Sequence, residues 1–331
     1  MGDPAADVLV IGAGVIGLTT AICLAEAGLT VLVVSAERPR QTTSAAAGAL
    51  WGPHLVGMDE RIGRWADVTL DRLEELRAPM IGASPLAGVV RRVEGMAASA
   101  TADSEPPEYA APGSLTPCRP DEVPAGYATA WRLTAPLIAM PGYLDYLCER
   151  LGRAGGTIAF GPRLRALPDA REAAPEARVI VNCAGYGARD LVFDPDVTAV
   201  RGQAVVVRNP GITEFFVGSG AAHWPLTYLF PHDEVVLLGG TEDEGSTSRE
   251  PDPGTAERIV EACAVIRPEL HDAAVLEHRV GLRPVRPSVR LEAESGDGCT
   301  VVHNYGHGGA GVTLSWGCAE DATQLVLDAL G

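Results

Sequence analysis

A glycine-rich turn near the N-terminus is the first segment whose residue types could do chemistry. The residues Gly12-Ala13-Gly14-Val15-Ile16-Gly17 follow an apolar run and precede a helical one, which is the context that the G-x-G-x-x-G pattern requires. Glycines here allow a tight turn, the close approach of a pyrophosphate and close helix–strand contact, while the N–H groups of the helix start favour an anion. The alternative is a plain glycine-rich turn, but the context favours dinucleotide binding.

An acidic residue follows the next apolar run. Glu37 is placed to accept hydrogen bonds from a ribose hydroxyl, and its charge would repel the 2′-phosphate of NADP. FAD and NAD both carry an adenosine diphosphate half, so these residues do not choose between them. The choice depends on the rest of the chain.

The elements that must position these residues read as a β–α–β unit. An apolar strand at Asp7–Ile11 leads into a helix from about Val15 to Ala27, which Gly28 ends, and a β-rich run follows at Thr30–Val34. Two parallel strands joined by a helix begin a doubly wound sheet. The apolar run from Val8 to Ala25 is therefore better explained as part of a folded unit than as a membrane span.

Further along the chain, helical and strand-like patterns alternate less regularly. Helices are predicted at about Met58–Arg77, Tyr143–Ala154 and Ala256–Ile266, and a final one runs from the glycine cluster Gly306–Gly311 through about Leu330. Strands are predicted at Gly88–Val93, Thr157–Phe160, Val179–Cys183, Gly202–Val207, Thr227–Phe230, Val235–Gly239 and Thr300–Asn304. The α/β pieces lie at the start, middle and end, with β-rich pieces between them. We therefore expect a discontinuous cofactor domain interleaved with a second domain.

The overall charge excludes some partners. The 331 residues carry 43 acidic and 26 basic side chains, a formal net charge of −17, which repels phosphate backbones and anionic lipid headgroups. We expect no nucleic-acid partner and no membrane partner. The seven cysteines are scattered, without a C-x-x-C pair, and are expected to be reduced thiols of a cytoplasmic protein.

Three segments outside the glycine turn resemble the D-amino-acid oxidase family of FAD enzymes. Val181-Asn182-Cys183-Ala184-Gly185 resembles a strand end near the cofactor, Gly281–Pro287 (GLRPVRP) the segment that anchors the substrate, and His303–Gly311 (HNYGHGGAG) the C-terminal flavin-contacting loop. The Thr42–Trp51 and Arg201–Gln203 segments are similar too. The match covers nearly the whole chain, and the two later segments are far more specific than the glycine turn.

The resemblance implies an α/β fold in which a Rossmann-like FAD-binding domain is interleaved with an antiparallel-β-rich substrate domain. Residues 1–57, 136–200 and 281–331 are expected to form the first domain, and residues 58–135 and 201–280 the second. FAD is expected to be bound non-covalently, although Cys318 and His54 are residue types that could in principle attach it. The expected cofactor-binding residues are Gly12, Gly14, Val15, Ile16, Gly17, Glu37, Arg38, Thr42, Thr43, Ser44, Gly48, Ala49, Leu50, Cys183, Ala184, Gly185, Arg283, His307, Gly308, Gly309, Gly311, Val312 and Thr313.

The same resemblance assigns roles toward the substrate. Arg283 would pair with the α-carboxylate, since a guanidinium fork grips a planar carboxylate, and the hydroxyl of Tyr228 would touch it as well. The alternatives are a surface ion pair for Arg283 and a core aromatic for Tyr228. Two expected pocket residues depart from the family pattern, because Trp224 and Ala310 stand where relatives place tyrosines. Gly309 completes the expected pocket.

The flavin loop is expected to present hydrogen-bond donors to the cofactor. His307 and the backbone N–H groups of Gly308 to Gly311 would face the isoalloxazine ring or the phosphates. Cys299, His303 and His307 are each four apart and could pass for metal ligands. They run from a strand into a glycine loop, where we expect that spacing not to share a face, so no metal site is predicted.

The implied reaction is oxidative deamination of D-amino acids by hydride transfer from Cα to flavin N5, giving 2-oxo acids, ammonia and H2O2. Neutral side chains are favoured, since no Arg lies between Pro210 and Tyr228 to pair with an acidic substrate. The alternatives are an FAD amine oxidase acting on glycine, sarcosine, D-aspartate or a cyclic imino acid, a dehydrogenase that does not use O2, and a flavin protein without turnover. The expected partners are a small amino acid and O2, and a homodimer is kept open.

Overall fold

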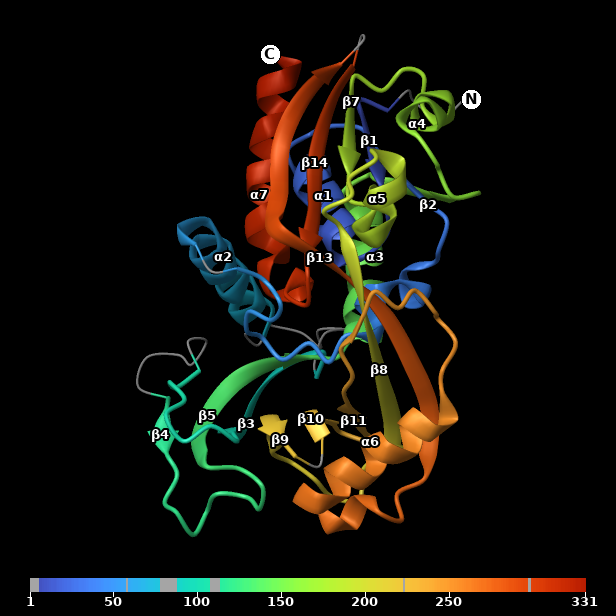
Figure 1. The fold of residues 1–331 in the computed structure, drawn as a ribbon. Coiled ribbons are helices and arrows are strands. Elements are labelled where there is room, and N and C mark those ends of the chain that lie inside the picture. Colours follow the sequence, from blue (N-terminus) through green and yellow to red (C-terminus); the bar gives the residue numbers. More distant parts are fainter. Residues whose placement is uncertain (1–5, 58, 78–87, 108–113, 223, 297–298) are drawn as a thin grey trace.

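A single mixed sheet of 14 strands runs through the computed structural model, which describes residues 6–57, 59–77, 88–107, 114–222, 224–296 and 299–331 (Figure 1). Across the sheet the order is β4 (Thr116–Pro117), β5 (Thr129–Ile138), β3 (Val90–Ser99), β9 (Phe215–Ala221), β10 (Trp224–His232), β11 (Val235–Gly239), β8 (Thr198–Arg208), β13 (Val275–Gly296), β14 (Cys299–His307), β7 (Val179–Asn182), β1 (Val8–Ile11), β2 (Val31–Ser35) and β6 (Thr157–Phe160), with β12 (Asp243–Glu244) beside β8.

Helices accompany both ends of this sheet. They are α1 (Val15–Glu26), α2 (Glu60–Arg77), α3 (Met140–Arg153), α4 (Leu167–Ala173), α5 (Ala188–Leu191), α6 (Pro253–Ile266) and α7 (Gly311–Leu330), with 3-10 turns η1 (Pro39–Gln41), η2 (Thr43–Ala46), η3 (Gly185–Gly187) and η4 (Pro268–Leu270). Most predicted elements are thus confirmed with shifted ends, and Met58 lies outside the described residues. Four predicted strands, those now seen as β3, β8, β10 and β14, were too short, because cross-strand pairing carries them past the most apolar residues.

The α/β half contains the parallel strands β14, β7, β1, β2 and β6. All four residues of β1 are buried, because alternate side chains enter different cores. Val8 and Val10 join the cluster that includes α1, α3 and α7, whereas Leu9 and Ile11 join residues of α4 and α5. A parallel sheet covered on both faces explains the uninterrupted apolar run that the sequence shows here.

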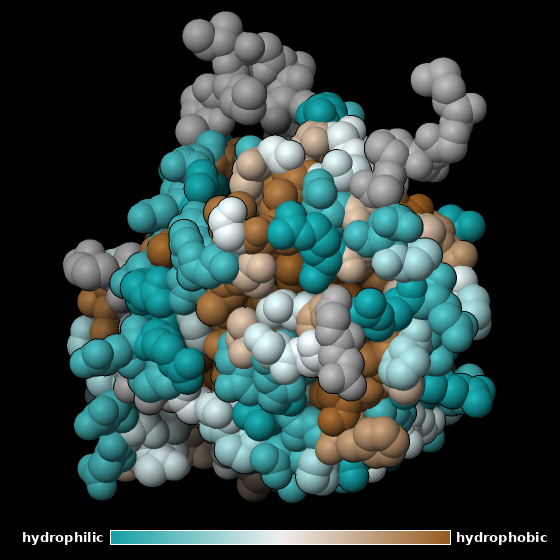
Figure 2. Space-filling view, turned by 90° about the horizontal axis from the view of Figure 1, so that it is seen from above, coloured by the Kyte–Doolittle hydropathy of each residue, from teal (hydrophilic) through white to brown (hydrophobic). Residues whose placement is uncertain are grey.

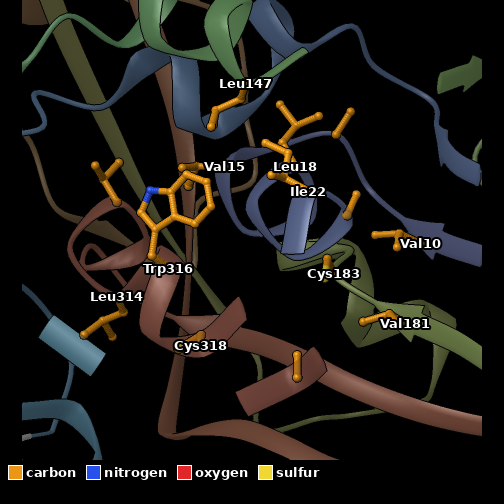
Figure 3. Packing of buried hydrophobic residues seen from close by; sticks show 14 of the residues in the cluster. Val10, Val15, Leu18, Ile22, Leu147, Val181, Cys183, Leu314, Trp316 and Cys318 are labelled. Atoms are coloured by element: carbon orange, nitrogen blue, oxygen red, sulfur yellow. The ribbon is translucent and has the colours of Figure 1, made fainter. Parts of the chain in front are cut away.

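Trp316 of α7 is one of the large aromatic side chains buried in the core of this half. Figure 3 shows its indole among Val15, Leu18 and Leu147. The indole Nε1–H donates to the Tyr143 hydroxyl at 2.8 Å, so its polar atom is satisfied inside the core. This packing fixes the beginning of α7 relative to that of α1.

The other half is a largely antiparallel sheet with a helix on one face. Val205, Leu229 and Leu238 face α6, while their neighbours Tyr228 and Phe230 belong to a separate cluster on the opposite side. In Figure 1 this half, with β3, β5, β8 to β11 and α6, lies below the α/β half. The period of two along β10 therefore sends Leu229 to the helix and Tyr228 away from it.

One long strand connects the halves. β13 pairs with β8 from Val275 to Val285 and then with β14 from Val285 to Gly296, with an irregularity between Val285 and Arg290. The predicted boundaries after residues 200 and 280 fall inside β8 and β13, so the halves share continuous strands. The division into two domains stays a prediction.

The surface is mixed and largely hydrophilic where Figure 2 shows it. Teal residues spread over this face, and brown residues lie between them. Among the described helices, none is long and apolar enough to span a bilayer.

Candidate functional site

A cavity of ≈ 550 Å³ lies where the two halves meet, a volume within the usual range for small-molecule sites. One wall comes from the α/β half, including the glycine turn and the start of α7. The other comes from β8, β10 and β13. Of the predicted cofactor residues it is lined by Gly12, Gly14, Val15, Ile16, Glu37, Thr42, Thr43, Ser44, Gly48, Ala49, Leu50, Cys183, Ala184, Gly185, Arg283, His307, Gly308, Gly309, Gly311, Val312 and Thr313.

The glycine turn has the close contacts that the sequence pattern predicts. Gly12 has φ +106°, and a Cβ there would lie 2.5 Å from the Cys183 carbonyl oxygen. A Cβ on Gly17 would lie 1.9 Å from the Gly12 carbonyl oxygen, so Gly17 supports the turn rather than lining the cavity. The turn therefore presents backbone at the start of α1, where N–H groups face an anion.

A hydroxyl already faces these N–H groups. Ser44 accepts a hydrogen bond from the Val15 N–H at 2.9 Å, and a Cβ on Gly14 would lie 3.1 Å from the same hydroxyl oxygen. The neighbouring Thr43 exchanges hydrogen bonds of 3.2 Å with the backbone of Leu282 on β13. Thr43 and Ser44 thus connect the glycine turn to β13, the strand that carries Arg283.

The acidic residue predicted to bind ribose lies on the cavity wall with a partner. Arg249 donates to the Glu37 carboxylate and, at 3.0 Å, to the Gln41 carbonyl oxygen. Arg249 also lines the cavity and was not anticipated from sequence. Arg38 is not among the lining residues, because its guanidinium lies over the Phe160 ring at 4.9 Å, so its predicted cofactor contact is not supported.

The expected donors of the flavin loop need a correction. The N–H of Gly308 donates to the Pro284 carbonyl oxygen at 2.9 Å and that of Gly309 to His54 at 3.0 Å, so the prediction that these groups face the cofactor was wrong. The loop instead leads into α7, whose first residues Gly311 to Thr313 line the cavity. The first N–H groups of a helix have no partner within it, so α7 supplies the donors here.

Three residues of the cavity wall each have a buried polar atom that a polar aromatic cofactor could pair. Trp51 Nε1, Asn304 Oδ1 and His307 Nε2 are buried without a hydrogen-bond partner in the described part of the chain, and all three residues line the cavity. Buried polar groups are normally paired. Both helix starts, the glycine turn and these atoms fit a cofactor with phosphates and a polar ring system such as FAD.

Burial controls the charge of His307. Desolvation lowers the pKa of this imidazole to about 3, so the ring is neutral near pH 7. A neutral imidazole offers one donor and one acceptor nitrogen. His307 can therefore hydrogen-bond a ring edge without adding a charge to the cavity.

Arg283 lies on β13 and Tyr228 on β10, and both line the same wall of the cavity. A Cβ on Gly202 would lie 2.6 Å from the Arg283 guanidinium, so this glycine leaves room for the side chain. Arg283 Nη1 donates to the Thr241 carbonyl oxygen at 2.8 Å, and the structure gives it no carboxylate partner among the described residues. Its remaining donors are available to an anion in the cavity.

The phenol of Tyr228 stays protonated beside this cation. Burial raises its pKa, and Arg283 opposes the rise. The ring stacks on Phe230 at a centroid distance of 4.8 Å, and it lies against Gly239 and Gly240, where a Cβ would clash. Tyr228 is therefore held as a hydrogen-bond donor close to Arg283.

A hydrogen-bonded pair beside this anchor, His54 and Glu242, was not predicted from the sequence to belong to the substrate pocket. His54 Nε2 lies 2.9 Å from Glu242 Oε1, and His54 lines the cavity. The hydrogen bond from His54 lowers the pKa of Glu242, and Arg283 acts in the same direction. Glu242 directly follows Thr241, the hydrogen-bond partner of Arg283. An acidic side chain thus lies close to the carboxylate anchor.

Two predicted pocket residues lie elsewhere. Trp224 is not among the lining residues, since its Nε1–H donates to the Gly240 carbonyl oxygen at 2.8 Å and Arg258 lies over its ring. Ala310 is fully buried in the core beside α7 and also does not line the cavity. The cavity wall therefore does not include them, and their pocket roles stay predictions. Gly309 does line the cavity, as predicted.

The expectation that Cys299, His303 and His307 do not share a face was wrong. Cys299, His303 and His307 all belong to β14, where residues four apart do share a face. They are roughly 13 Å apart along the strand at about 3.3 Å per residue, which is too far for one ion. Among the described residues, no group of three His, Cys, Asp or Glu side chains could hold a metal. Cys318 is fully buried in the core of Figure 3, away from the cavity wall.

Fold and site together define a dinucleotide-binding oxidoreductase whose cofactor half and substrate half meet at one cavity. A family model for FAD dependent oxidoreductases matches residues 7–325, so the chain belongs to this family and FAD is its cofactor. The match spans both halves of the sheet. The resemblance seen in the sequence is confirmed.

Named relatives cover almost the whole chain. The D-amino-acid oxidase of Rubrobacter xylanophilus is 46% identical over 99% of this chain and 98% of its own length. The human D-aspartate oxidase is 32% identical over 97% of this chain and 94% of its own. The glycine oxidase of Geobacillus kaustophilus has a TM-score of 0.80 at 17% identity, covering 98% of this chain and 95% of its own, and shows the shared fold.

Proposed function

We propose that this chain oxidises D-amino acids with neutral side chains to 2-oxo acids, ammonia and H2O2. The observation that carries the proposal is Arg283, a guanidinium on the cavity wall that has no carboxylate partner among the described residues and lies close to the Tyr228 phenol. The 46% identical relative named D-amino-acid oxidase supports the same activity.

The chain's own residues bind and orient the substrate. The fork of Arg283 grips the α-carboxylate, and the Tyr228 hydroxyl donates a further hydrogen bond to it. Two anchors on one carboxylate leave the amino group, the side chain and the Cα–H in fixed directions, which is how positioning lowers the barrier. The enantiomer whose Cα–H points toward the cofactor side is the one that reacts.

FAD, when bound, supplies a two-electron acceptor that O2 can reoxidise with release of H2O2. The amino acid loses two electrons and two protons, its Cα–N bond becomes C=N, and water then releases ammonia and leaves the 2-oxo acid. Tyr228 stays protonated, and a pKa of about 3 makes the His307 imidazole a weak base, so neither side chain is suited to remove a proton from Cα. The amine must be neutral when Cα–H leaves, so the rate rises with pH toward the amine pKa in the complex.

The charge around the anchor supports neutral over acidic side chains. Glu242 and its partner His54 lie beside Arg283, and no arginine lies between residues 210 and 228. A D-aspartate side chain would bring a second carboxylate toward Glu242, and like charges repel. Glycine, sarcosine and cyclic imino acids remain the alternative substrates, because their carboxylates fit the same anchor.

The test is peroxide and 2-oxo acid release by the FAD-loaded protein across matched D- and L-amino acids, glycine and sarcosine. We expect D-alanine and other neutral D-forms to be oxidised and their L-forms to be inert. Faster turnover of glycine or sarcosine would move the assignment to an amine oxidase. D-aspartate turnover equal to that of D-alanine would contradict the assigned charge preference.

Three broader features of this function are proposed with it. The scattered free cysteines support a cytoplasmic location. A homodimer stays a prediction that sedimentation or light scattering of the holoenzyme tests. The predicted domain division would be supported if urea unfolded the apoprotein in two separate transitions.

A further inference from the structure

A connection between β11 and α6 reaches across the cavity. We call residues 241–252 the strap. Its Thr247 and Arg249 line the cavity, although the strap starts and ends in the antiparallel half. Arg249 contacts Glu37 and Gln41, which follow β2 in the α/β half. The strap therefore joins the two halves at the position predicted for the cofactor ribose.

The base of the strap is firmly held by β8. Arg201 is only 5% exposed and donates to the carbonyl oxygens of Ser248 at 3.0 Å and Glu250 at 2.8 Å. Its neighbour Gln203 exchanges hydrogen bonds of 2.8 and 2.9 Å with the backbone of Asp252. A buried guanidinium that satisfies two carbonyl groups fixes the path of this segment.

The Arg249 side chain, at the tip of the strap, is held more weakly than the backbone around it. The side chains of Arg249 and Glu37 are each 39% exposed, and exposed ion pairs of this kind contribute little stability. Two of the five N–H groups of Arg249 are engaged with residues of the described chain. The Arg249 side chain can therefore leave Glu37 while the backbone of Ser248 and Glu250 stays in place, and its unused donors are available to a ligand in the cavity.

We propose that Arg249 binds the adenosine diphosphate half of FAD, and that this side chain, held out by the fixed strap, retains the cofactor at this end of the cavity. The Glu37 carboxylate has enough lone pairs to accept from both Arg249 and a ribose hydroxyl. The guanidinium then lies beside the ribose and pyrophosphate, the groups for which its charge is suited. The assignment rests on the FAD requirement of the family and not on which amino acid is oxidised.

The test measures cofactor binding rather than turnover. Arg249→Met is compared with Arg258→Met, which makes the same change in net charge on α6, where Arg258 lies over Trp224. We expect Arg249→Met to release FAD at least about fivefold faster after dilution, as followed by flavin fluorescence, and to weaken binding of ADP to the apoprotein by a similar factor. Arg258→Met should behave as the wild type.

Other outcomes would overturn the proposal. FAD release and ADP affinity within about twofold of the wild type in Arg249→Met would show that the guanidinium makes no contact that matters. Equal effects of both variants, or a lower melting temperature of Arg249→Met apoprotein, would assign the change to general stability. Arg249→Glu, which repels Glu37, should release FAD faster still. Flavin fluorescence reports these results even if the enzyme oxidises no D-amino acid.

Discussion

The cofactor half and the substrate half build their sides of the cavity by different means. The cofactor side is mostly backbone, from the glycine turn at Gly12 to Gly17 and the first turns of α1 and α7. The substrate side depends on the side chains Arg283 and Tyr228, which come from separate strands. Backbone sites tolerate few changes in shape, whereas side-chain sites can change specificity by single substitutions.

The largest expected effect is the loss of the carboxylate anchor. Arg283→Met should lower kcat/KM for D-alanine by about 10³-fold, because it removes a charged, hydrogen-bonded partner worth on the order of 4 kcal/mol. Arg283→Lys is the matched variant: it keeps the charge but not the fork, and should recover only part of the loss. Steady-state kinetics with saturating FAD measures both. Wild-type kcat/KM in Arg283→Met would break the assignment of the substrate side.

On the cofactor side, adding a single methyl group to the glycine turn should destabilise the fold and prevent FAD binding. Gly17→Ala places a Cβ 1.9 Å from the Gly12 carbonyl oxygen, so we expect the free energy of unfolding to fall by about 3 kcal/mol and FAD uptake to fail. Gly63→Ala is the control, since a Cβ there meets nothing within 4 Å and Ala favours a helix by about 1 kcal/mol. Urea unfolding of the apoproteins and flavin absorbance are the readouts. Normal FAD binding by Gly17→Ala would contradict the close contact.

A smaller effect is expected from the second anchor. Tyr228→Phe removes one hydrogen bond to a charged group and should lower kcat/KM about tenfold, mainly through KM. The stacking on Phe230 should survive the change. The affinity for propionate, which keeps the carboxylate but lacks the amine, should fall by the same factor in a flavin absorbance titration. An unchanged propionate affinity would show that the hydroxyl does not touch the carboxylate.

At acidic pH the free energy of unfolding should fall, because the buried histidines of the cofactor side are neutral in the folded chain and become protonated when it unfolds. Burial lowers the pKa of His307 to about 3 and that of His303 as well, so the unfolded chain binds more protons than the folded one below pH 6.5. The stability contributed by neutral His307 is therefore full above that pH and falls as the pH drops toward 3, by up to about 1.4 kcal/mol per pH unit, and His303 acts in the same direction. Urea unfolding of the apoprotein at pH 7 and pH 5 measures this. The slope should be shallower in His307→Gln.

The smallest effect concerns side-chain selectivity. Glu242→Gln removes a partly exposed negative charge near Arg283, so D-aspartate should gain about threefold in kcat/KM relative to D-alanine. His54→Gln is the matched control for the hydrogen bond alone. The ratio of the two kcat/KM values is the measurement. An unchanged ratio in Glu242→Gln would remove this carboxylate from the account of specificity.

The two halves also differ in how far sequence could predict them. The glycine turn and the start of α7 are contiguous segments, so their positions were predicted correctly from local patterns. Arg283 and Tyr228 were found only through a family resemblance. Arg249 and Glu242 lie on a strap whose path depends on Arg201, and no local pattern reveals that path. The hydrogen bond from the Trp224 indole to the Gly240 carbonyl oxygen joins residues 16 apart in the chain, so no local pattern reveals that contact either.

The most direct test of the account is anaerobic mixing of the FAD-loaded protein with D-alanine and, separately, with L-alanine, followed by flavin absorbance. We expect rapid bleaching of the flavin by D-alanine, none by L-alanine, and bleaching slowed by about 10³-fold in Arg283→Met at subsaturating substrate. Equal bleaching by both enantiomers, or none by either, would contradict the claim that Arg283 and Tyr228 orient a D-amino acid toward the cofactor.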